Sequence, residues 1–273
     1  MKLSAKLAGT SIALLLFAYL GFCALLYFSQ SSFLYHPTPV VPGPAEPLIG
    51  FTDGNARLLV STHIYAGDSA ILYLGGNGED VSQSMPTLLT AFPHASIYAL
   101  HYRGYSGSTG APSEASLVAD GKMLFDLIHK KHRNVTVIGR SLGSGIAVQV
   151  ASARPAVRLV LVTPYNSIAE IAAQRFKYIP VRWLLKDTYE SWRFASLVSA
   201  PTSIIAAGQD SVIPIQNTLR LLPHFRAGTA TFTIIPGVGH NSISESPLYV
   251  PALRGINVGA NNSFKPKPLR GSA

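Results

Sequence analysis

Residues 134–153 read NVTVIGRSLGSGIAVQVASA, and this stretch decides the fold. Its first part, 135–138, is a β-branched apolar run typical of a buried strand, and its second part, 142–153, has the pattern of a helix. Between them stands a G-x-S-x-G motif at 139–143, and a serine on such a strand-to-helix turn has a strained backbone. Glycine on either side leaves room for this tight turn. The motif therefore predicts that the Ser141 hydroxyl projects from the carboxyl end of a strand and acts as a nucleophile.

On both sides of this stretch, short β-rich runs alternate with helical patterns, which is typical of a parallel sheet covered on both faces. Strands are predicted at 58–64, 70–74, 96–100, 135–138, 159–162, 203–207 and 231–235. Helices are predicted at 113–131, 142–153, 168–178 and 215–221. The predicted fold class is α/β: an α/β-hydrolase fold with a mostly parallel, doubly wound sheet and a small helical cap, preceded by one N-terminal transmembrane helix.

Glycine-rich turns follow several predicted strands, and two of these turns carry residues that could activate Ser141. Asp210 follows the strand 203–207 in GQDSVIP, and His240 follows the strand 231–235 in PGVGH. In this fold the chain order is serine, acid, histidine. A serine hydroxyl needs a base to take its proton, so we predict His240 as the general base and later the general acid. Asp210 would orient the imidazole and stabilise its charged form.

The remaining histidines and acids are less suited to these roles. The other histidines stand in the linker, on a charged helix end, before the serine or at a helix terminus: His36, His63, His94, His101, His129, His132 and His224. An aspartate before a helix is also a common N-cap. Asp187 and Glu170 therefore remain as alternative acids to Asp210.

The loop after the strand 70–74 predicts part of an oxyanion hole. It reads Gly75-Gly76-Asn77-Gly78, and glycines let backbone N–H groups approach a substrate oxygen closely. We predict the Asn77 N–H as one donor, with a plain turn as the alternative. The other predicted donor is the N–H of Leu142, at the start of the helix after Ser141, where the helix dipole favours developing negative charge.

The N-terminal segment predicts a membrane anchor. Residues 8–28 read AGTSIALLLFAYLGFCALLYF, without charge or proline, and about 20 helical residues span the hydrocarbon core of a bilayer. Lys2 and Lys6 precede this run, and no lysine or arginine follows it up to Gly50. The positive-inside bias therefore predicts a cytoplasmic N-terminus and a catalytic domain on the other side, periplasmic in a Gram-negative bacterium. A cleaved signal peptide is the alternative, although its apolar region is usually shorter.

The chain divides into four predicted parts. These are an anchor at 1–30, a linker at 31–47 with five prolines in HPTPVVPGPAEP, a hydrolase domain at 48–254 and a weakly ordered tail at 255–273. Proline removes backbone donors and restricts φ, so the linker is expected to be semi-rigid. The segment 164–200 is longer than a simple connection, and we predict a small helical cap there. An ordinary helix with its loops is the alternative.

Charge and cysteine content bound the possible environments. The formal net charge of +9 is spread along the chain, and its densest basic run is 129–133. Attraction to anionic lipid headgroups is favoured over nucleic-acid binding, because no nucleic-acid recognition motif is present. The single cysteine, Cys23, lies in the apolar run, so the rest of the chain forms no internal disulfide and could fold in a reducing or an oxidising compartment.

The turns resemble those of the Bem-type α/β-hydrolases, membrane-anchored proteins related to mammalian protein depalmitoylases. The matching stretches are Gly76-Asn77, RGYSGSTG at 103–110, GRSLG at 139–143, DSVIP at 210–214 and GVGHN at 237–241. The resemblance covers 70–241 and agrees with an N-terminal anchor. Two positions depart from the pattern: Gly75 stands where relatives often carry histidine, and Ser106 replaces a glycine. Arg103 and Tyr105 match the pattern, and we interpret them as structural support for the site.

These residues predict hydrolysis of an acyl ester or thioester through an acyl-enzyme, with no metal or organic cofactor. The expected substrate is an acyl ester or thioester of a lipid or a lipid-modified partner, and the chain is expected to contact the membrane through its N-terminal helix. Two alternatives stay open: a serine peptidase or amidase with the same triad, and a scaffold that has lost turnover.

Overall fold

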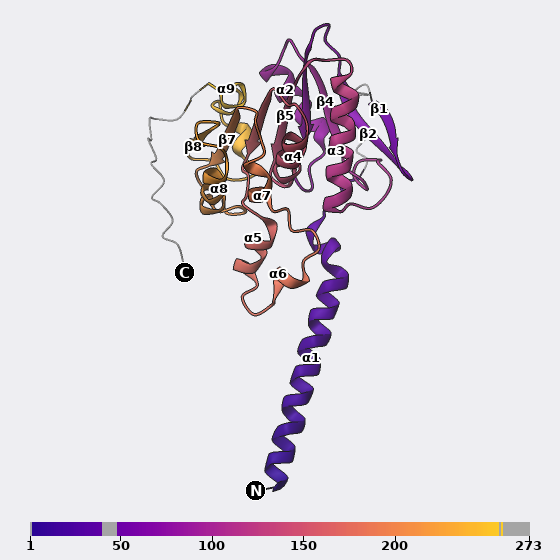
Figure 1. Cartoon of the computed structure of the whole chain (residues 1–273), viewed down its shortest axis with the longest axis vertical. Helices are drawn as coiled ribbons and strands as arrows, with labels where there is room; N and C mark the ends of the chain where they lie inside the picture. The colour runs from indigo at the N-terminus through magenta and orange to yellow at the C-terminus, as the bar shows by residue number, and fades with distance from the viewer. Residues whose placement is uncertain (1, 40–47, 257, 259–273) are drawn as a thin grey trace.

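A mixed eight-stranded sheet forms the centre of the described part of the molecule, a computed structural model (Figure 1). The structure describes residues 2–39, 48–256 and 258, with side chains from residue 9 onward. The strands are β1 (Leu48–Asp53), β2 (Ala56–His63), β3 (Ser69–Leu74), β4 (Ser96–His101), β5 (Asn134–Arg140), β6 (Arg158–Val162), β7 (Thr202–Ala207) and β8 (Ala230–Ile235). Their order is β1-β2-β4-β3-β5-β6-β7-β8, in which β2 pairs antiparallel with β1 and β4, and the other neighbours are parallel.

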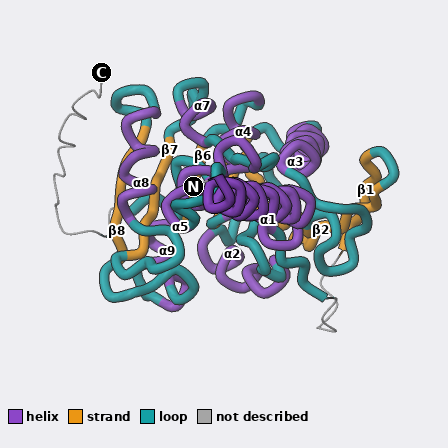
Figure 2. Tube along the Cα trace, turned by 90° about the horizontal axis from the view of Figure 1, so that it is seen from below, coloured by secondary structure: helices purple, strands orange, loops and turns teal. Residues whose placement is uncertain are grey.

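Helices cover both faces of this sheet (Figure 2). One face carries α3 (Glu114–His129), α4 (Leu142–Ala153), α7 (Ser191–Ala195) and α8 (Ile215–Leu221), and the other carries α2 (Met85–Ala91) and α9 (Tyr249–Arg254). Successive strand residues point to opposite faces. Leu72 and Val137 accordingly lie in the cluster under α3 and α4, whereas Ile71 and Ile138 lie in the cluster under α2 and α9. The sheet is therefore doubly wound, and the predicted fold class is confirmed.

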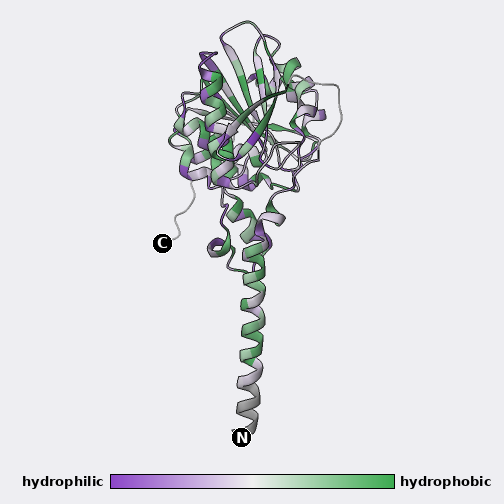
Figure 3. Cartoon of the chain, turned by 90° about the vertical axis from the view of Figure 1, so that its right-hand side faces the viewer, coloured by the Kyte–Doolittle hydropathy of each residue, from purple (hydrophilic) through white to green (hydrophobic). Residues whose placement is uncertain are grey.

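Helix α1 (Lys2–Leu34) extends away from the sheet (Figure 1). Its surface is apolar along most of its length (Figure 3), and Leu15 and Phe17 are 71% and 77% exposed. By length and composition, Gly9–Leu34 is the helix in the described ranges that could cross a membrane. The helix includes SQSSFL at 29–34, so it ends four residues beyond residue 30, where the anchor was predicted to end.

The predicted cap segment divides into two parts. Helices α5 (Ile168–Arg175) and α6 (Val181–Leu184) lie away from the sheet, beside the last turns of α1 (Figures 1 and 2). We call residues 168–186, from the start of α5 to just past the end of α6, the α5–α6 hairpin. By contrast, α7 packs on α4 and belongs to the layer that covers the sheet. The segment therefore supplies both a projecting hairpin and an ordinary covering helix.

Each predicted strand is present, but several elements were not predicted. Strand β1 has a mostly exposed burial pattern at the edge of the sheet, so the alternation expected of a half-buried strand is weak. Helices α2, α6, α7 and α9 are too short to show a helical period. Helix α5 ends at Arg175 rather than 178, and α3 ends at His129 rather than 131. Of the predicted linker and tail, residues 40–47, 257 and 259–273 lie outside the described residues.

Candidate active site

The turn between β5 and α4 holds Ser141 in a strained backbone conformation. Ser141 has φ 49° and ψ −118°, outside the regions that L-residues normally occupy. A methyl group at Gly139 would overlap the backbone of Gly143, and one at Gly143 would overlap the carbonyl of Leu74. Both glycines are therefore sterically required, since β3, β5 and α4 meet here with no space for a Cβ atom. This packing presents the Ser141 hydroxyl at the carboxyl end of the sheet.

The three predicted triad residues come together at this edge. His240 Nε2 lies 2.9 Å from Ser141 Oγ, and His240 Nδ1 lies 2.7 Å from Asp210 Oδ2. The other carboxylate oxygen of Asp210 accepts the N–H groups of Val212 at 2.9 Å and Ile213 at 2.7 Å. The Asp210 and His240 side chains are only 3% and 7% exposed. This arrangement can orient the imidazole so that Nε2 accepts the serine proton.

The loop after β3 lies directly against the serine. A methyl group added at Gly76 would lie 3.5 Å from Ser141 Cβ. The Gly76 N–H is already used, since it donates to Glu79 Oε2 at 2.6 Å. The next amide along the loop is that of Asn77, the predicted second oxyanion donor. The Leu142 N–H is the first of helix α4, where amides have no carbonyl partner within the helix.

Gly75 is explained by packing rather than by chemistry. A methyl group at this position would overlap the side chain of Val81, so the loop has no room for a larger residue. The Gly75 carbonyl accepts the Tyr102 hydroxyl at 2.9 Å and the Gly143 N–H at 3.1 Å. These bonds tie the loop to the nucleophile turn.

Known proteins are similar to this chain in sequence or in fold. A protein of Mycobacterium tuberculosis described as uncharacterised is 33% identical over 227 residues, which cover 80% of this chain and 79% of that protein. The lysophosphatidylserine lipase ABHD12 of Xenopus tropicalis is 30% identical over 217 residues, which cover 67% of this chain and 56% of that lipase. The esterase Pf2001 of Pyrococcus furiosus superposes with a TM-score of 0.65 at 16% identity, covering 81% of this chain and 98% of that structure. No protein-family model matches the chain.

The chain belongs to the α/β-hydrolase superfamily. This membership confirms the predicted enzyme class, a serine hydrolase of esters, at the level of the superfamily. Membership of the narrower Bem-type group stays a prediction, which is based on the resemblance of the turns.

An ion pair in this α/β hydrolase connects the turn at Ser141 to the loop at 75–79, which we call the oxyanion loop after its predicted donor Asn77. This ion pair was not predicted from the sequence. Arg140 Nη1 lies 3.2 Å from Glu79 Oε2, with side-chain exposures of 15% and 10%. Burial opposes the charge on Arg140, but Glu79 and the nearby tyrosines outweigh it and raise the pKa of the guanidinium. Tyr73 Oη and Ser84 Oγ both donate to Glu79 Oε1 at 2.6 Å. Arg140 stands in GRSLG and Glu79 directly follows Gly78, but nothing in the sequence of either stretch shows that the two side chains meet.

The alternative acids lie elsewhere in the hydrolase. Asp187 accepts the Tyr35 hydroxyl at 2.9 Å and the Glu114 N–H at 3.0 Å, so it connects the end of α1 to the start of α3. Glu170 pairs with Arg220. Of the three candidate acids, Asp210 is the one that contacts His240.

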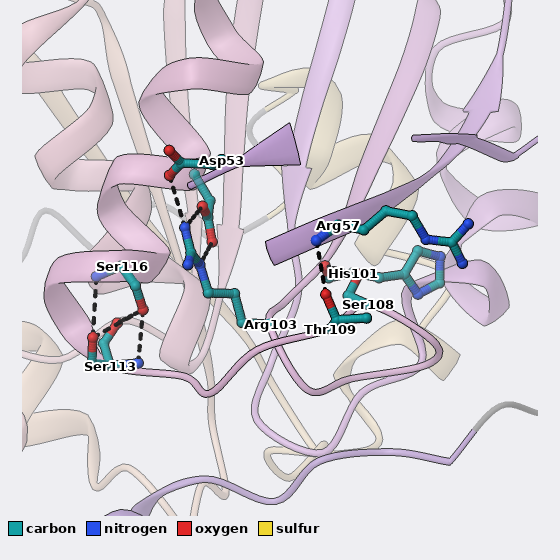
Figure 4. A network of polar contacts seen from close by, with 9 residues as sticks. Asp53, Arg57, His101, Arg103, Ser108, Thr109, Ser113 and Ser116 are labelled. Atoms are coloured by element: carbon teal, nitrogen blue, oxygen red, sulfur yellow. Dashed lines mark hydrogen bonds and ion pairs between the residues drawn. The ribbon is translucent and has the colours of Figure 1, made fainter. Parts of the chain in front are cut away.

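The RGYSGSTG loop at 103–110 contacts the loop at 75–79 through Tyr105 and Asn77. Arg103 donates to both oxygens of Asp120, at 2.8 and 2.7 Å, and to Asp53 at 2.8 Å (Figure 4). Tyr105 Oη donates to Asn77 Oδ1 at 2.8 Å, and burial raises the pKa of Tyr105 to about 12, so this phenol stays protonated at neutral pH. Ser106, which replaces a glycine in the resemblance, has φ 44°, the left-handed conformation that glycine adopts readily.

Proposed function

We propose that this α/β hydrolase is a membrane-anchored enzyme that cleaves an acyl ester or thioester through an acyl-enzyme on Ser141. The observation that carries the proposal is the continuous pair of hydrogen bonds from Ser141 through His240 to Asp210. The position of α1 supports the anchor, and the turns that resemble Bem-type hydrolases support a place in that group. The lipase named among the relatives supports a lipid or lipid-modified substrate.

The proposed chemistry follows from the geometry. Ser141 Oγ attacks the carbonyl carbon while His240 Nε2 takes the hydroxyl proton, and Asp210 stabilises the imidazolium. The Leu142 and Asn77 N–H groups bind the developing oxyanion. Collapse of the tetrahedral intermediate breaks the bond to the alcohol or thiol, which leaves with the proton from His240. A water molecule then gives a proton to His240 as its oxygen attacks the acyl carbon. Collapse of this second intermediate breaks the bond between Ser141 Oγ and the acyl carbon, returns the proton from His240 to Ser141 and releases the acid.

The topology belongs to the same proposal. Lys2 and Lys6, which precede the apolar run at 8–28, favour a cytoplasmic N-terminus and a catalytic domain on the non-cytoplasmic side, which is the periplasm if the source is a Gram-negative bacterium. A reporter fused after Ala273 should then be active only in the non-cytoplasmic compartment.

Labelling with a fluorophosphonate probe tests the assignment of the nucleophile. The full chain should be labelled and should hydrolyse p-nitrophenyl esters, and Ser141→Ala should abolish the labelling. We expect its kcat to fall by at least about 10⁴-fold, because the nucleophile is removed while the fold is retained. Ser152→Ala, in the last turn of α4 and away from Ser141, is the matched control and should keep both properties. Equal labelling of Ser141→Ala and the unmodified chain would refute the proposal, and faster cleavage of peptide amides than of esters would replace it with a peptidase.

A further inference from the structure

An apolar cavity lies between the anchor helix and the α5–α6 hairpin. Its volume is about 430 Å³, within the range of about 300–1,000 Å³ that is typical of small-molecule sites. Among the described residues that line it, all but Gln30 and Arg175 are apolar. The α1 wall includes Leu26 and Phe33, and the hairpin wall includes Ala172 and Leu185. The cavity therefore suits a ligand without polar groups along its length.

The hairpin follows α1 far down its length. The Tyr19 hydroxyl donates to the Tyr178 carbonyl at 2.8 Å, and the Lys186 ammonium lies 4.3 Å from the centre of the Tyr27 ring. From Tyr19 to Leu34 the helix rises about 22 Å, at about 1.5 Å per residue. If α1 spans a bilayer, the hairpin must therefore lie at the level of the lipid.

The exposed side chains of the hairpin agree with such a position. Tyr178 and Trp183 are 91% and 89% exposed, and Lys177 and Arg182 are exposed beside them. Tyrosine, tryptophan, lysine and arginine have apolar stems and polar tips, so from the level of the lipid these side chains can extend to the interface and its anionic headgroups. In Figure 3 the apolar residues of α1 continue up to this region. The cavity between α1 and the hairpin would therefore lie next to the acyl chains of the bilayer.

A hydrogen bond joins one wall residue of the cavity to the loop that lies against Ser141. Leu34 lines the cavity, and its carbonyl accepts a hydrogen bond from Asn77 Nδ2 at 2.6 Å. The Asn77 side chain also accepts the His36 N–H at 2.9 Å, so it holds the end of α1 on both sides of Tyr35. On the chain, Asn77 follows Gly76, which lies against Ser141. An acyl chain in the cavity would therefore approach the nucleophile past the oxyanion loop.

We propose that this cavity binds the acyl chain of a membrane-resident lipid ester, so that the anchor helix forms one wall of the substrate site. The inference rests on the proposed function, since it assigns a substrate class to the same nucleophile. Burying one methylene strengthens binding by about fourfold, so a long chain gains far more from this cavity than an acetyl group does. The enzyme should prefer long-chain esters for this reason.

Filling the cavity tests the proposal on the full chain in lipid nanodiscs. Ala172→Phe places a ring in the hairpin wall, and Ala173→Phe, at a neighbouring position that is not part of the lining, is its matched control. We expect Ala172→Phe to lower kcat/KM for p-nitrophenyl dodecanoate by at least tenfold, and to leave p-nitrophenyl acetate within twofold. The control should leave both esters within twofold. An equal effect of Ala172→Phe on the two esters would overturn the acyl site.

A second pair of variants tests the wall that α1 supplies. This test stays valid even if one of the two hairpin variants fails to fold. Leu26→Trp faces the cavity, while Leu25→Trp changes an exposed neighbour outside the lining. Leu26→Trp alone should reduce dodecanoate turnover selectively, and equal behaviour of the two variants would exclude α1 as a wall. If the unmodified chain cleaves neither ester, the proposed function itself fails. If it cleaves both and no variant distinguishes them, only the acyl site fails.

Discussion

The turn at Ser141 and the α5–α6 hairpin lie at the same end of the sheet but are built in opposite ways. At the turn, backbone from β3, β5 and α4 meets so closely that Gly139 and Gly143 have no room for a methyl group. The hairpin instead exposes Tyr178 and Trp183 almost fully, and Tyr19 and Gln30 of α1 each donate a hydrogen bond to it. The turn can hold reacting atoms in place, and the hairpin can adapt to a substrate. This difference separates the residues expected to set the rate from those expected to select the acyl chain.

The largest expected contrast is between two carboxylates, one in each region. Asp210→Asn should lower kcat by about 10⁴-fold, because an amide opposite His240 Nδ1 favours the wrong tautomer of the ring. Its remaining carbonyl oxygen can still accept the Val212 and Ile213 N–H groups, so the unfolding midpoint should change little. Asp187→Asn, beside the hairpin, is the matched control and should keep kcat within a few-fold in ester hydrolysis. Comparable losses of kcat in the two variants would mean that residues beside the hairpin affect the rate as strongly as the turn does.

The buried ion pair at the turn should give a smaller effect that reaches both stability and rate. Glu79→Gln leaves the Arg140 charge without its carboxylate partner, and removal of one member of a buried pair typically costs about 3 kcal/mol of unfolding free energy. It also weakens the contact to the Gly76 N–H, so the oxyanion loop should loosen and kcat should fall by about 10- to 100-fold. Urea unfolding and ester kinetics on the same preparation measure both losses.

An exposed pair provides the control for that measurement. Arg193 and Glu190 lie 2.7 Å apart with exposures of 60% and 25%, and such pairs contribute about 0–1 kcal/mol. Glu190→Gln should therefore change stability by less than about 1 kcal/mol and leave kcat unchanged. A Glu79→Gln variant as stable and active as Glu190→Gln would show that the ion pair does not hold the loop.

The two regions also differ in how far the sequence predicts them. At the turn, the constraint is local: a β-rich run, glycine on both sides of a serine and the order serine, acid, histidine lead to Ser141, Asp210 and His240, which the structure brings within hydrogen-bonding distance. The roles of these residues in catalysis stay predictions. The Glu79–Arg140 pair joins positions far apart along the chain, and no local pattern records that contact. The packing of the hairpin on α1 is of the same kind, since Gln30 and Leu184 meet only in the folded chain.

The smallest expected effect concerns the polar clamp between α1 and the hairpin. Gln30 donates to the Leu184 carbonyl at 3.1 Å and accepts the Lys186 N–H at 2.7 Å. Gln30→Ala removes both bonds, and at about 0.5–1.5 kcal/mol each the hairpin should lose about 1–2 kcal/mol of local stability. Exchange of the Lys186 amide should then accelerate by about tenfold, as hydrogen-exchange mass spectrometry would measure.

Because the clamp lies outside the catalytic turn, hydrolysis of p-nitrophenyl acetate by Gln30→Ala should stay within twofold of the unmodified chain. Gln83→Ala, an exposed glutamine next to α2, controls for loss of the side chain as such and should change neither property. If Gln30→Ala slowed acetate hydrolysis as strongly as Glu79→Gln, motion of the hairpin would reach the oxyanion loop through Leu34 and Asn77. The turn and the hairpin would then act as one mechanical unit, and the anchor helix would influence the rate as well as the choice of substrate.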